Sequence, residues 1–143
     1  MNNLKFQRCL NKNKIKTFSN GPKLVFKEMK VALKDWKSAK ESLKNNNYKW
    51  STIQSYYSMF HVARALLFNK GYREKSHYCL VIAIRELYVN EGLLSFSFVE
   101  AFQLGKTLRE NADYHDDFSQ LGAKKMLKKA KGFFSKAKKI FKK

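Results

Sequence analysis

Apolar residues recur at helical spacing along almost the whole of this chain, and little interrupts them. The 143 residues include one proline and six glycines. Long stretches of Lys, Leu, Ala and Glu favour helices, whereas we find no convincing run of alternating apolar and polar residues that would predict a strand. We therefore predict an all-α protein, an up-down bundle of four to five helices.

Capping and turn residues divide this pattern into separate helices. Ser and Asn side chains suit helix starts, and a glycine often ends a helix in the left-handed conformation, as we expect for Gly71. The predicted helices run from Pro22 to about Lys44, from near Ser51 to Lys70, from Ser76 to the stop at Asn90-Glu91-Gly92, from about Ser95 to Ala112, and from about Ser119 onward. The second is apolar over so wide an arc that we place it at the centre of the bundle.

The length of the chain fits one domain with a single core. A hydrophobic content of 44% and an aromatic content of 15% favour a packed interior over a disordered chain. Residues 1–20 are rich in Asn and Lys, and there we predict a basic N-terminal arm or a short helix. Residues 21–143 should form the bundle, including a Lys-rich amphipathic C-terminal helix over residues 119–143.

The net charge of +19 favours polyanions or anionic surfaces as partners. Residues 124–143 hold ten lysines and no acid. The apolar stripe of this last helix could pack on the bundle or bind an anionic membrane surface, or the lysines could bind nucleic acid. We favour packing, which leaves the lysines free to meet RNA. The lysines that we assign to nucleic-acid binding are Lys124, Lys125, Lys128, Lys129 and Lys131.

No apolar stretch approaches the length of a membrane span, and the N-terminal segment lacks the continuous apolar core of a signal peptide. We expect a cytoplasmic protein with no membrane partner. Cys9 and Cys79 show neither CxxC nor zinc spacing, so we predict two reduced thiols, with Cys79 as a small apolar core residue.

Residues 109–115 pair a fixed cation with a group that transfers protons. Arg109 keeps its charge at any ordinary pH, and His115 can exchange a proton near neutrality. Such a pair suffices for cutting RNA without a metal. On an uninterrupted helix the two residues would lie about 120° apart in projection. We therefore predict that the helix breaks near Asp113 and that His115 folds back toward Arg109.

Three other residues are secondary candidates. His61 and Arg64 lie one turn apart and could line a groove, although we favour a hydrogen-bonded structural role for the histidine. His77 falls in the first turn of the third predicted helix, where free backbone N–H groups favour an anion or an acceptor. It could be a local cap or part of a phosphate site.

The acids around His115 raise an alternative and an objection. Asp113, His115, Asp116 and Asp117 could together hold a divalent cation, but their spacing is not a recognised ligand pattern. We predict neither a metal nor a cofactor. These acids and Glu110 would also repel RNA, and the lysines of the last helix would have to offset their negative potential.

Four segments occur in a characteristic order. They are Tyr56-Tyr57-Ser58-Met59-Phe60-His61-Val62-Ala63-Arg64-Ala65-Leu66-Leu67, Lys70-Gly71-Tyr72, Ser76-His77 and Arg109-Glu110-Asn111-Ala112-Asp113-Tyr114. Together they resemble landmarks of the HEPN domain superfamily over roughly residues 22–143, and most of all the small stand-alone, toxin-like HEPN proteins of bacteria and archaea. The resemblance implies a bundle of four or five helices, commonly a homodimer, in which two copies of an Arg and a following His face each other across a cleft.

Many HEPN proteins are metal-independent ribonucleases, often toxins paired with a nucleotidyltransferase-like antitoxin, or parts of antiviral systems. The resemblance implies catalytic roles for Arg109, His115 and Asn111, with Glu110, Asp113 and Tyr114 in structural or supporting roles. In this hypothesis His115 takes a proton from a ribose 2′-hydroxyl, Arg109 stabilises charge on the phosphate, and Asn111 orients the phosphate or His115.

Other HEPN proteins have no demonstrated nuclease activity. The alternative is therefore a non-catalytic HEPN module that binds nucleotide, RNA or a protein partner. Arg109 and Asp113, one turn apart, would then simply form an ion pair that closes the helix.

Overall fold

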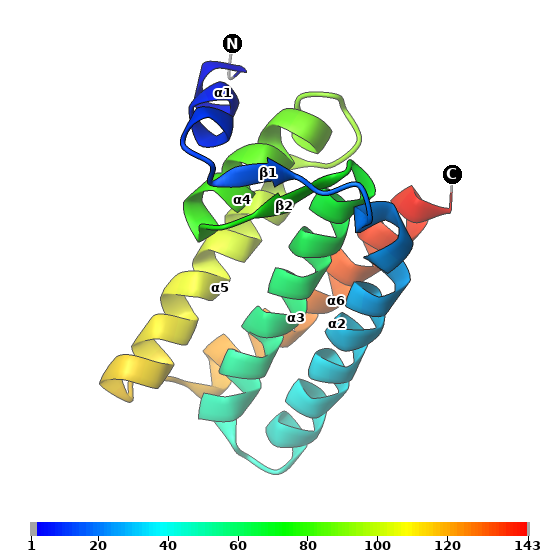
Figure 1. Cartoon of the computed structure of the whole chain (residues 1–143). Coiled ribbons are helices and arrows are strands. Elements are labelled where there is room, and N and C mark those ends of the chain that lie inside the picture. Colours follow the sequence, from blue (N-terminus) through cyan, green and yellow to red (C-terminus); the bar gives the residue numbers. More distant parts are fainter. Residues whose placement is uncertain (1–2, 143) are drawn as a thin grey trace.

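The computed structural model of the chain describes residues 3–142. The elements, in order, are α1 (Asn3–Asn11), β1 (Ile15–Thr17), α2 (Gly21–Lys44), α3 (Tyr48–Asn69), β2 (Tyr72–Glu74), α4 (His77–Ile84), the π-helical turn η1 (Arg85–Val89), α5 (Phe96–His115) and α6 (Gln120–Phe141). The long helices lie alongside one another, and α4 with η1 crosses one end of the bundle beside the two short strands (Figure 1). The predicted all-α class and helical bundle are confirmed.

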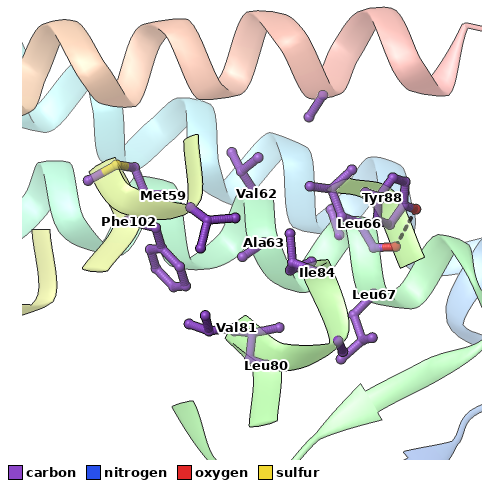
Figure 2. Close-up of a cluster of buried hydrophobic side chains, with 14 of the residues drawn as sticks. Met59, Val62, Ala63, Leu66, Leu67, Leu80, Val81, Ile84, Tyr88 and Phe102 are labelled. Atoms are coloured by element: carbon purple, nitrogen blue, oxygen red, sulfur yellow. Dashed lines mark hydrogen bonds between the residues drawn. The ribbon is translucent and has the colours of Figure 1, made fainter. Parts of the chain in front are cut away.

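Helix α3 lies at the centre of the bundle, in contact with α2, α4, α5 and α6. Its core residues Met59, Val62 and Leu66 are fully buried and meet side chains of α4, η1 and α5 (Figure 2). Among these is Tyr88 of η1, whose hydroxyl donates to the Leu66 carbonyl over 2.6 Å. The central position that we predicted for this helix is therefore confirmed.

Several predicted helix ends are confirmed. The Ser76 and Ser95 side chains accept from the backbone N–H groups at the starts of α4 and α5, and Ser119 does the same for α6. Gly71 follows α3 with a φ of 81°, in the left-handed region where glycine costs least. The start of α3 was predicted wrongly, because the cap is Asn47 rather than Ser51. Ser51 lies inside the helix, where its buried hydroxyl donates to the Ala39 carbonyl over 2.9 Å.

The N-terminal residues pack onto the bundle through α1 and a small sheet. Ile15 of β1 pairs with Glu74 of β2, in antiparallel register. We predicted no strand, because three-residue strands are too short to show alternation. Phe6 of α1 is buried with its ring edge-on to Tyr72 at 5.7 Å.

Cys9 of α1 and Cys79 of α4 form a disulfide. The prediction of two reduced thiols is therefore wrong. Packing of α1 on α4 brings the two Cα atoms to 5.8 Å, although 70 residues separate them in sequence. Cys79 is 5% exposed and does belong to the core.

Helix α6 packs its apolar stripe on α2, α3 and α5. Met126, Phe133 and Ala137 are at most 1% exposed, which confirms the packing interpretation of this helix. Most of its lysines point outward. Within residues 3–142, no helix combines the length and apolar content that crossing a bilayer requires.

Candidate functional site

The candidate site lies at the C-terminal end of α5, which continues without a break to His115. The predicted break near Asp113 is wrong. Ala112 is fully buried and holds this turn on the bundle, and the ion pair from Arg109 to Asp113, 3.3 Å at i,i+4, spans it. The helix ends at Asp116, whose φ of 51° places it in the left-handed region.

Three tyrosine rings surround the guanidinium of Arg109. Its Cζ atom lies 6.0, 5.3 and 5.2 Å from the ring centroids of Tyr56, Tyr57 and Tyr114. Its Nη2 donates to the Tyr57 hydroxyl over 2.8 Å and its Nη1 to the Tyr114 hydroxyl over 3.3 Å. The contacts hold the cation at a fixed position between α3 and α5.

The electrostatics of this cage favour a charged Arg109 beside a neutral Tyr56. Burial alone would lower the pKa of Arg109, but Tyr57, Tyr114 and Asp113 together raise it above its usual value. Burial raises the pKa of Tyr56, against an opposing effect of Arg109, so this phenol stays protonated. The Nε atom of Arg109 is buried and has no partner among the described residues.

The tyrosine hydroxyls have donor capacity left for a ligand. Tyr57 and Tyr114 each accept a hydrogen bond from Arg109, so the hydroxyl proton of each can still be donated. An anion at the edge of the cage would meet these two protons beside the fixed positive charge. The sequence did not reveal this role of Tyr57, because nothing in its spacing showed that it would meet Arg109, 52 residues further along the chain.

His115 does not meet Arg109 within one chain. Six residues of continuous helix separate them by about 9 Å along the axis and about 120° around it, and His115 is exposed. Asn111 is half-buried, and its carbonyl accepts from the backbone N–H groups of Asp116 and Asp117. The structure thus brings Arg109, Asp113 and Tyr114 together and leaves His115 apart.

Three of the four acids in this region are paired with cations. Besides Asp113, Glu110 contacts Lys106 at 3.3 Å, and Asp116 contacts Lys49 of α3 at 3.2 Å. These pairs are partly exposed and add little to stability. They do neutralise most of the negative charge that we expected to repel RNA.

A family model of the HEPN domain matches residues 27–140, a range that includes this site and nearly all of the bundle. The chain belongs to the HEPN domain family. "Putative toxin MJ0605" of Methanocaldococcus jannaschii is 28% identical to it over 115 residues, covering 80% of this chain and 86% of the relative. "UPF0332 protein PH1297" of Pyrococcus horikoshii is 34% identical over 73 residues, or 51% of each chain. The HEPN chain is therefore similar over most of its length to a protein named as a toxin.

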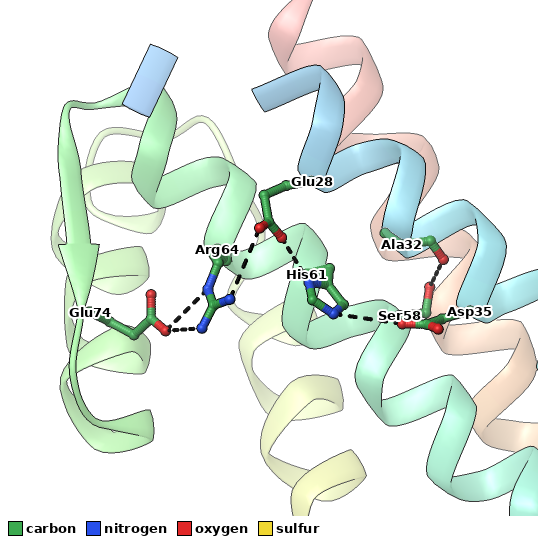
Figure 3. Close-up of polar contacts among 7 residues, drawn as sticks. All are labelled: Glu28, Ala32, Asp35, Ser58, His61, Arg64 and Glu74. Atoms are coloured by element: carbon green, nitrogen blue, oxygen red, sulfur yellow. Dashed lines mark hydrogen bonds and ion pairs between the residues drawn. The ribbon is translucent and has the colours of Figure 1, made fainter. Parts of the chain in front are cut away.

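In this HEPN chain, His61 and Arg64 belong to a separate polar cluster between α2, α3 and β2 (Figure 3). His61 Nδ1 lies 2.7 Å from Glu28 Oε2, and its Nε2 lies 3.7 Å from an Asp35 oxygen. Arg64 donates twice to Glu74, over 2.7 and 3.2 Å. Neither residue contacts α5 in these interactions, which fits the structural role that we favoured for the histidine.

His77 is half-buried at the start of α4, against aromatic rings. Its ring stacks on Tyr56 at 6.1 Å and contacts Phe102 at 4.8 Å between centroids. Burial, helped by the charge of Lys106, lowers the pKa of His77 to about 4, so the ring is neutral at pH 7. Its Nε2 atom is buried and has no hydrogen-bond partner within residues 3–142. Ser76, not His77, caps the helix, so His77 is not the local cap that we considered.

The five lysines predicted to bind nucleic acid do not line one groove. Lys125, Lys128 and Lys129 line a groove of about 390 Å³ with Phe98 and Ala101 of α5. Lys131 instead borders the groove between α6 and α2. Lys124 is exposed and borders neither groove.

No group of three or more His, Cys, Asp or Glu side chains in the described part of the chain lies close enough to hold a metal ion. Asp113, His115, Asp116 and Asp117, which we considered as a cation site, do not form such a group.

Proposed function

We propose that this HEPN chain is a metal-independent endoribonuclease of a toxin or defence system, and that two copies of the chain build its active site. The observation that carries the proposal is the caged guanidinium of Arg109 near the end of α5, with His115 exposed on the last turn. Because one chain separates the two groups, the His115 that acts with a given Arg109 comes from the second subunit.

An apolar surface beside His115 supports a homodimer of this kind. Tyr114, Phe118 and Leu121 are 64%, 43% and 77% exposed at the junction of α5 and α6. Apolar side chains that cluster on a surface often mark a contact with another protein. A second copy that covered them would bring its own α5 end, and therefore its own His115, close to this site.

The proposed reaction needs a base, a fixed cation and a positioned phosphate. His115 takes the proton of a ribose 2′-hydroxyl, and the 2′ oxygen attacks the adjacent phosphorus. The bond to the 5′ oxygen breaks, that oxygen takes a proton from solvent, and a 2′,3′-cyclic phosphate remains. Arg109 and the hydroxyl protons of Tyr57 and Tyr114 stabilise charge on the phosphate oxygens. Asn111 positions the end of α5 through its carbonyl.

RNA is the substrate that the charge of the chain favours. The net charge is +19, and Lys125, Lys128 and Lys129 form a basic groove along α5 and α6. Neutralising phosphates with lysines releases counterions, so cleavage should weaken steeply with salt. By analogy with the HEPN toxins, a nucleotidyltransferase-like antitoxin is the partner that we propose for inhibition.

The test begins with purified protein, a panel of unstructured RNAs and EDTA. We expect cleavage that leaves 2′,3′-cyclic phosphate ends, and loss of at least a hundredfold in rate for Arg109→Ala and for His115→Ala. His61→Ala is the matched control, because it removes a histidine of the separate polar cluster. No cleavage by the wild type, or cleavage unaffected by both site variants, would contradict the proposal.

Mixed dimers test whether the site is shared. An Arg109→Ala chain co-expressed with a differently tagged His115→Ala chain gives a heterodimer that retains one intact pair across the interface. We expect this heterodimer to regain a substantial part of the wild-type activity, whereas each homodimer is inactive. A heterodimer as inactive as either parent would mean that both groups act from the same chain.

A second candidate function is a non-catalytic HEPN module that binds nucleotide, RNA or a protein partner. It is favoured by the engagement of Arg109 with Asp113 and two tyrosines, contacts that also suit a purely structural arginine. RNA binding without cleavage, lost in Arg109→Ala but retained in His115→Ala, would select this function.

A further inference from the structure

Helices α2 and α6 run antiparallel and leave an apolar groove along their outer face. Phe26 near the start of α2 shares a cavity of about 350 Å³ with Phe141 at the end of α6. Further along, Trp36 lines an adjoining cavity of about 340 Å³ that also includes Lys131. The floor of the groove is apolar throughout, made of Phe26, Met29, Leu33, Trp36, Phe134 and Phe141.

Part of this apolar floor is fully open to solvent. Phe26 is 82% exposed, the highest exposure among the large apolar side chains of the described residues. From Phe26 to Trp36 the groove extends over ten residues of α2, or about 15 Å. Phe26 is exposed and Leu33, Trp36, Phe134 and Phe141 are half-buried, so an apolar strip of this length reaches solvent along one side, and such strips often mark a surface at which another molecule binds.

Two rows of lysines border the groove at helical spacing. One row is Lys30, Lys34 and Lys37 of α2, where Lys30 lines the groove and Lys34 and Lys37 line an adjoining hollow that shares Lys30 and Leu33 with it. The other row is Lys131 and Lys138 of α6 with Lys142 just after its end. None of the six takes part in an ion pair among the described residues, and α6 contains no acid. Among the described residues that line these cavities and the adjoining hollow, Glu41 is the one acid, and it lies beyond the far end of the apolar floor. The groove is thus apolar along its centre and positively charged on both sides.

The floor is unsuited to stacked nucleic-acid bases. Lys40 and Lys131 already lie over the Trp36 ring, at 5.5 and 5.6 Å from its centroid. The indole N–H of Trp36 donates to the Leu127 carbonyl over 3.0 Å, which leaves it unavailable to a ligand. Apart from Ser135 and the lysines, the two cavities along the floor offer no polar side chain to read a base edge.

We propose that this groove binds an acidic amphipathic helix of a partner protein. The lysines of each row are spaced by three, four or seven residues, which are the spacings that carboxylates adopt along one face of a helix. A helix of about three turns would fit the 15 Å length, with an apolar stripe on the floor and an acidic row facing each lysine row. The proposal does not depend on nuclease activity, because the groove is formed by α2 and α6 and the site lies on α5 and α3.

A designed peptide is the probe. It has about fourteen residues, leucines at i, i+3, i+4 and i+7, and glutamates on both flanks of that stripe. Fluorescence anisotropy should show saturable binding to the full-length protein, at least tenfold tighter than for a scrambled peptide or for one with every Glu replaced by Gln. Circular dichroism of the complex should show helix gained by the peptide.

Variants of the protein test the location. Lys34→Glu with Lys138→Glu should weaken binding at least tenfold, and so should the exposed Phe26→Glu. Lys124→Glu with Lys128→Glu makes the same change of net charge on α6 outside the groove and should alter affinity less than threefold. All variants are checked for native helical content and thermal unfolding.

Three results would overturn the proposal. One is binding of the scrambled peptide as tightly as the designed one, and another is equal loss of affinity in the groove and control charge reversals. The third is that phosphatidylglycerol vesicles or a twelve-nucleotide RNA bind in a manner that depends on Phe26 and Lys138 while the acidic peptide does not. Such an outcome would assign the groove to a membrane surface or to RNA.

Discussion

Breaking the Cys9–Cys79 disulfide should destabilise the folded protein by several kcal/mol. The bond joins residues separated by 70 positions. In the chain-entropy model, closing a loop of this length removes about 15 cal/mol/K from the unfolded chain, or about 4 kcal/mol at 25 °C. The two thiols would stay buried after reduction. Because a buried thiol packs as a small apolar group, the contacts around the two sulfurs should change little, and the loss of stability should stay close to the value from chain entropy.

Urea unfolding with and without a phosphine reductant measures this effect. With a slope of roughly 2 kcal/mol per molar urea, a loss of about 4 kcal/mol moves the midpoint down by about 2 M. The double variant Cys9→Ser/Cys79→Ser is the control, and its midpoint should be low and indifferent to the reductant. Coincident curves for the oxidised and reduced protein would refute the reasoning, and so would two free thiols titrated in the unreduced native protein. A smaller shift with fast hydrogen exchange confined to α1 would mean that α1 detaches before the bundle unfolds.

Three more predictions concern glycines, a histidine and the end of α5. Gly21→Ala should destabilise the protein by about 1–3 kcal/mol, because a Cβ there would meet the Phe68 carbonyl oxygen at 2.5 Å. Gly132→Ala should stabilise α6 by about 0.5–1 kcal/mol, because the nearest atom to its Cβ would be 3.9 Å away. Chemical denaturation of the two variants measures both effects. His77 should make stability fall as pH drops from 6.5 toward 4, because the folded state holds the pKa near 4 while the unfolded chain takes up the proton near 6.5. That decline should be smaller in His77→Phe and unchanged in His115→Phe, and an identical profile for all three proteins would contradict it. Asp116→Gly should raise the free energy of unfolding by up to about 1 kcal/mol, because glycine adopts the left-handed φ of 51° more readily than Asp does. The exposed ion pair with Lys49 that is lost contributes little. A lower melting temperature than that of the wild type would contradict this prediction.

The sequence predicted those parts of the fold that depend on local signals. The caps Ser76, Ser95 and Ser119 and the glycine at Gly71 are recognised because each acts on the backbone within a few residues. The start of α3 was predicted wrongly because local signals did not decide it. Asn47 and Ser51 are both good caps, and the hydrogen bond from Ser51 to the Ala39 carbonyl forms only when α2 and α3 pack.

The remaining features depend on contacts between distant residues. The disulfide requires α1 to lie on α4, and the two three-residue strands pair across a gap of more than fifty residues. At the candidate site, a break near Asp113 was predicted because it would bring His115 back to Arg109, but α5 stays helical to His115 with Ala112 fully buried against the bundle. Tyr57 was missed for a related reason, since it reaches Arg109 only because α3 and α5 lie side by side.

The unbroken course of α5 to His115 also bears on how an activity that needs both groups would respond to dose. If Arg109 and His115 act together only across two chains, the active species is a dimer, and at low concentration its amount follows the square of the chain concentration. As long as most chains are unpaired, halving the amount of protein would reduce the activity about fourfold. If α5 had ended near Asp113 and His115 had folded back to Arg109, each chain would act alone. The activity would then be proportional to the chain concentration. The added turn of α5 would therefore set a threshold, below which the protein is nearly silent and above which its effect rises steeply.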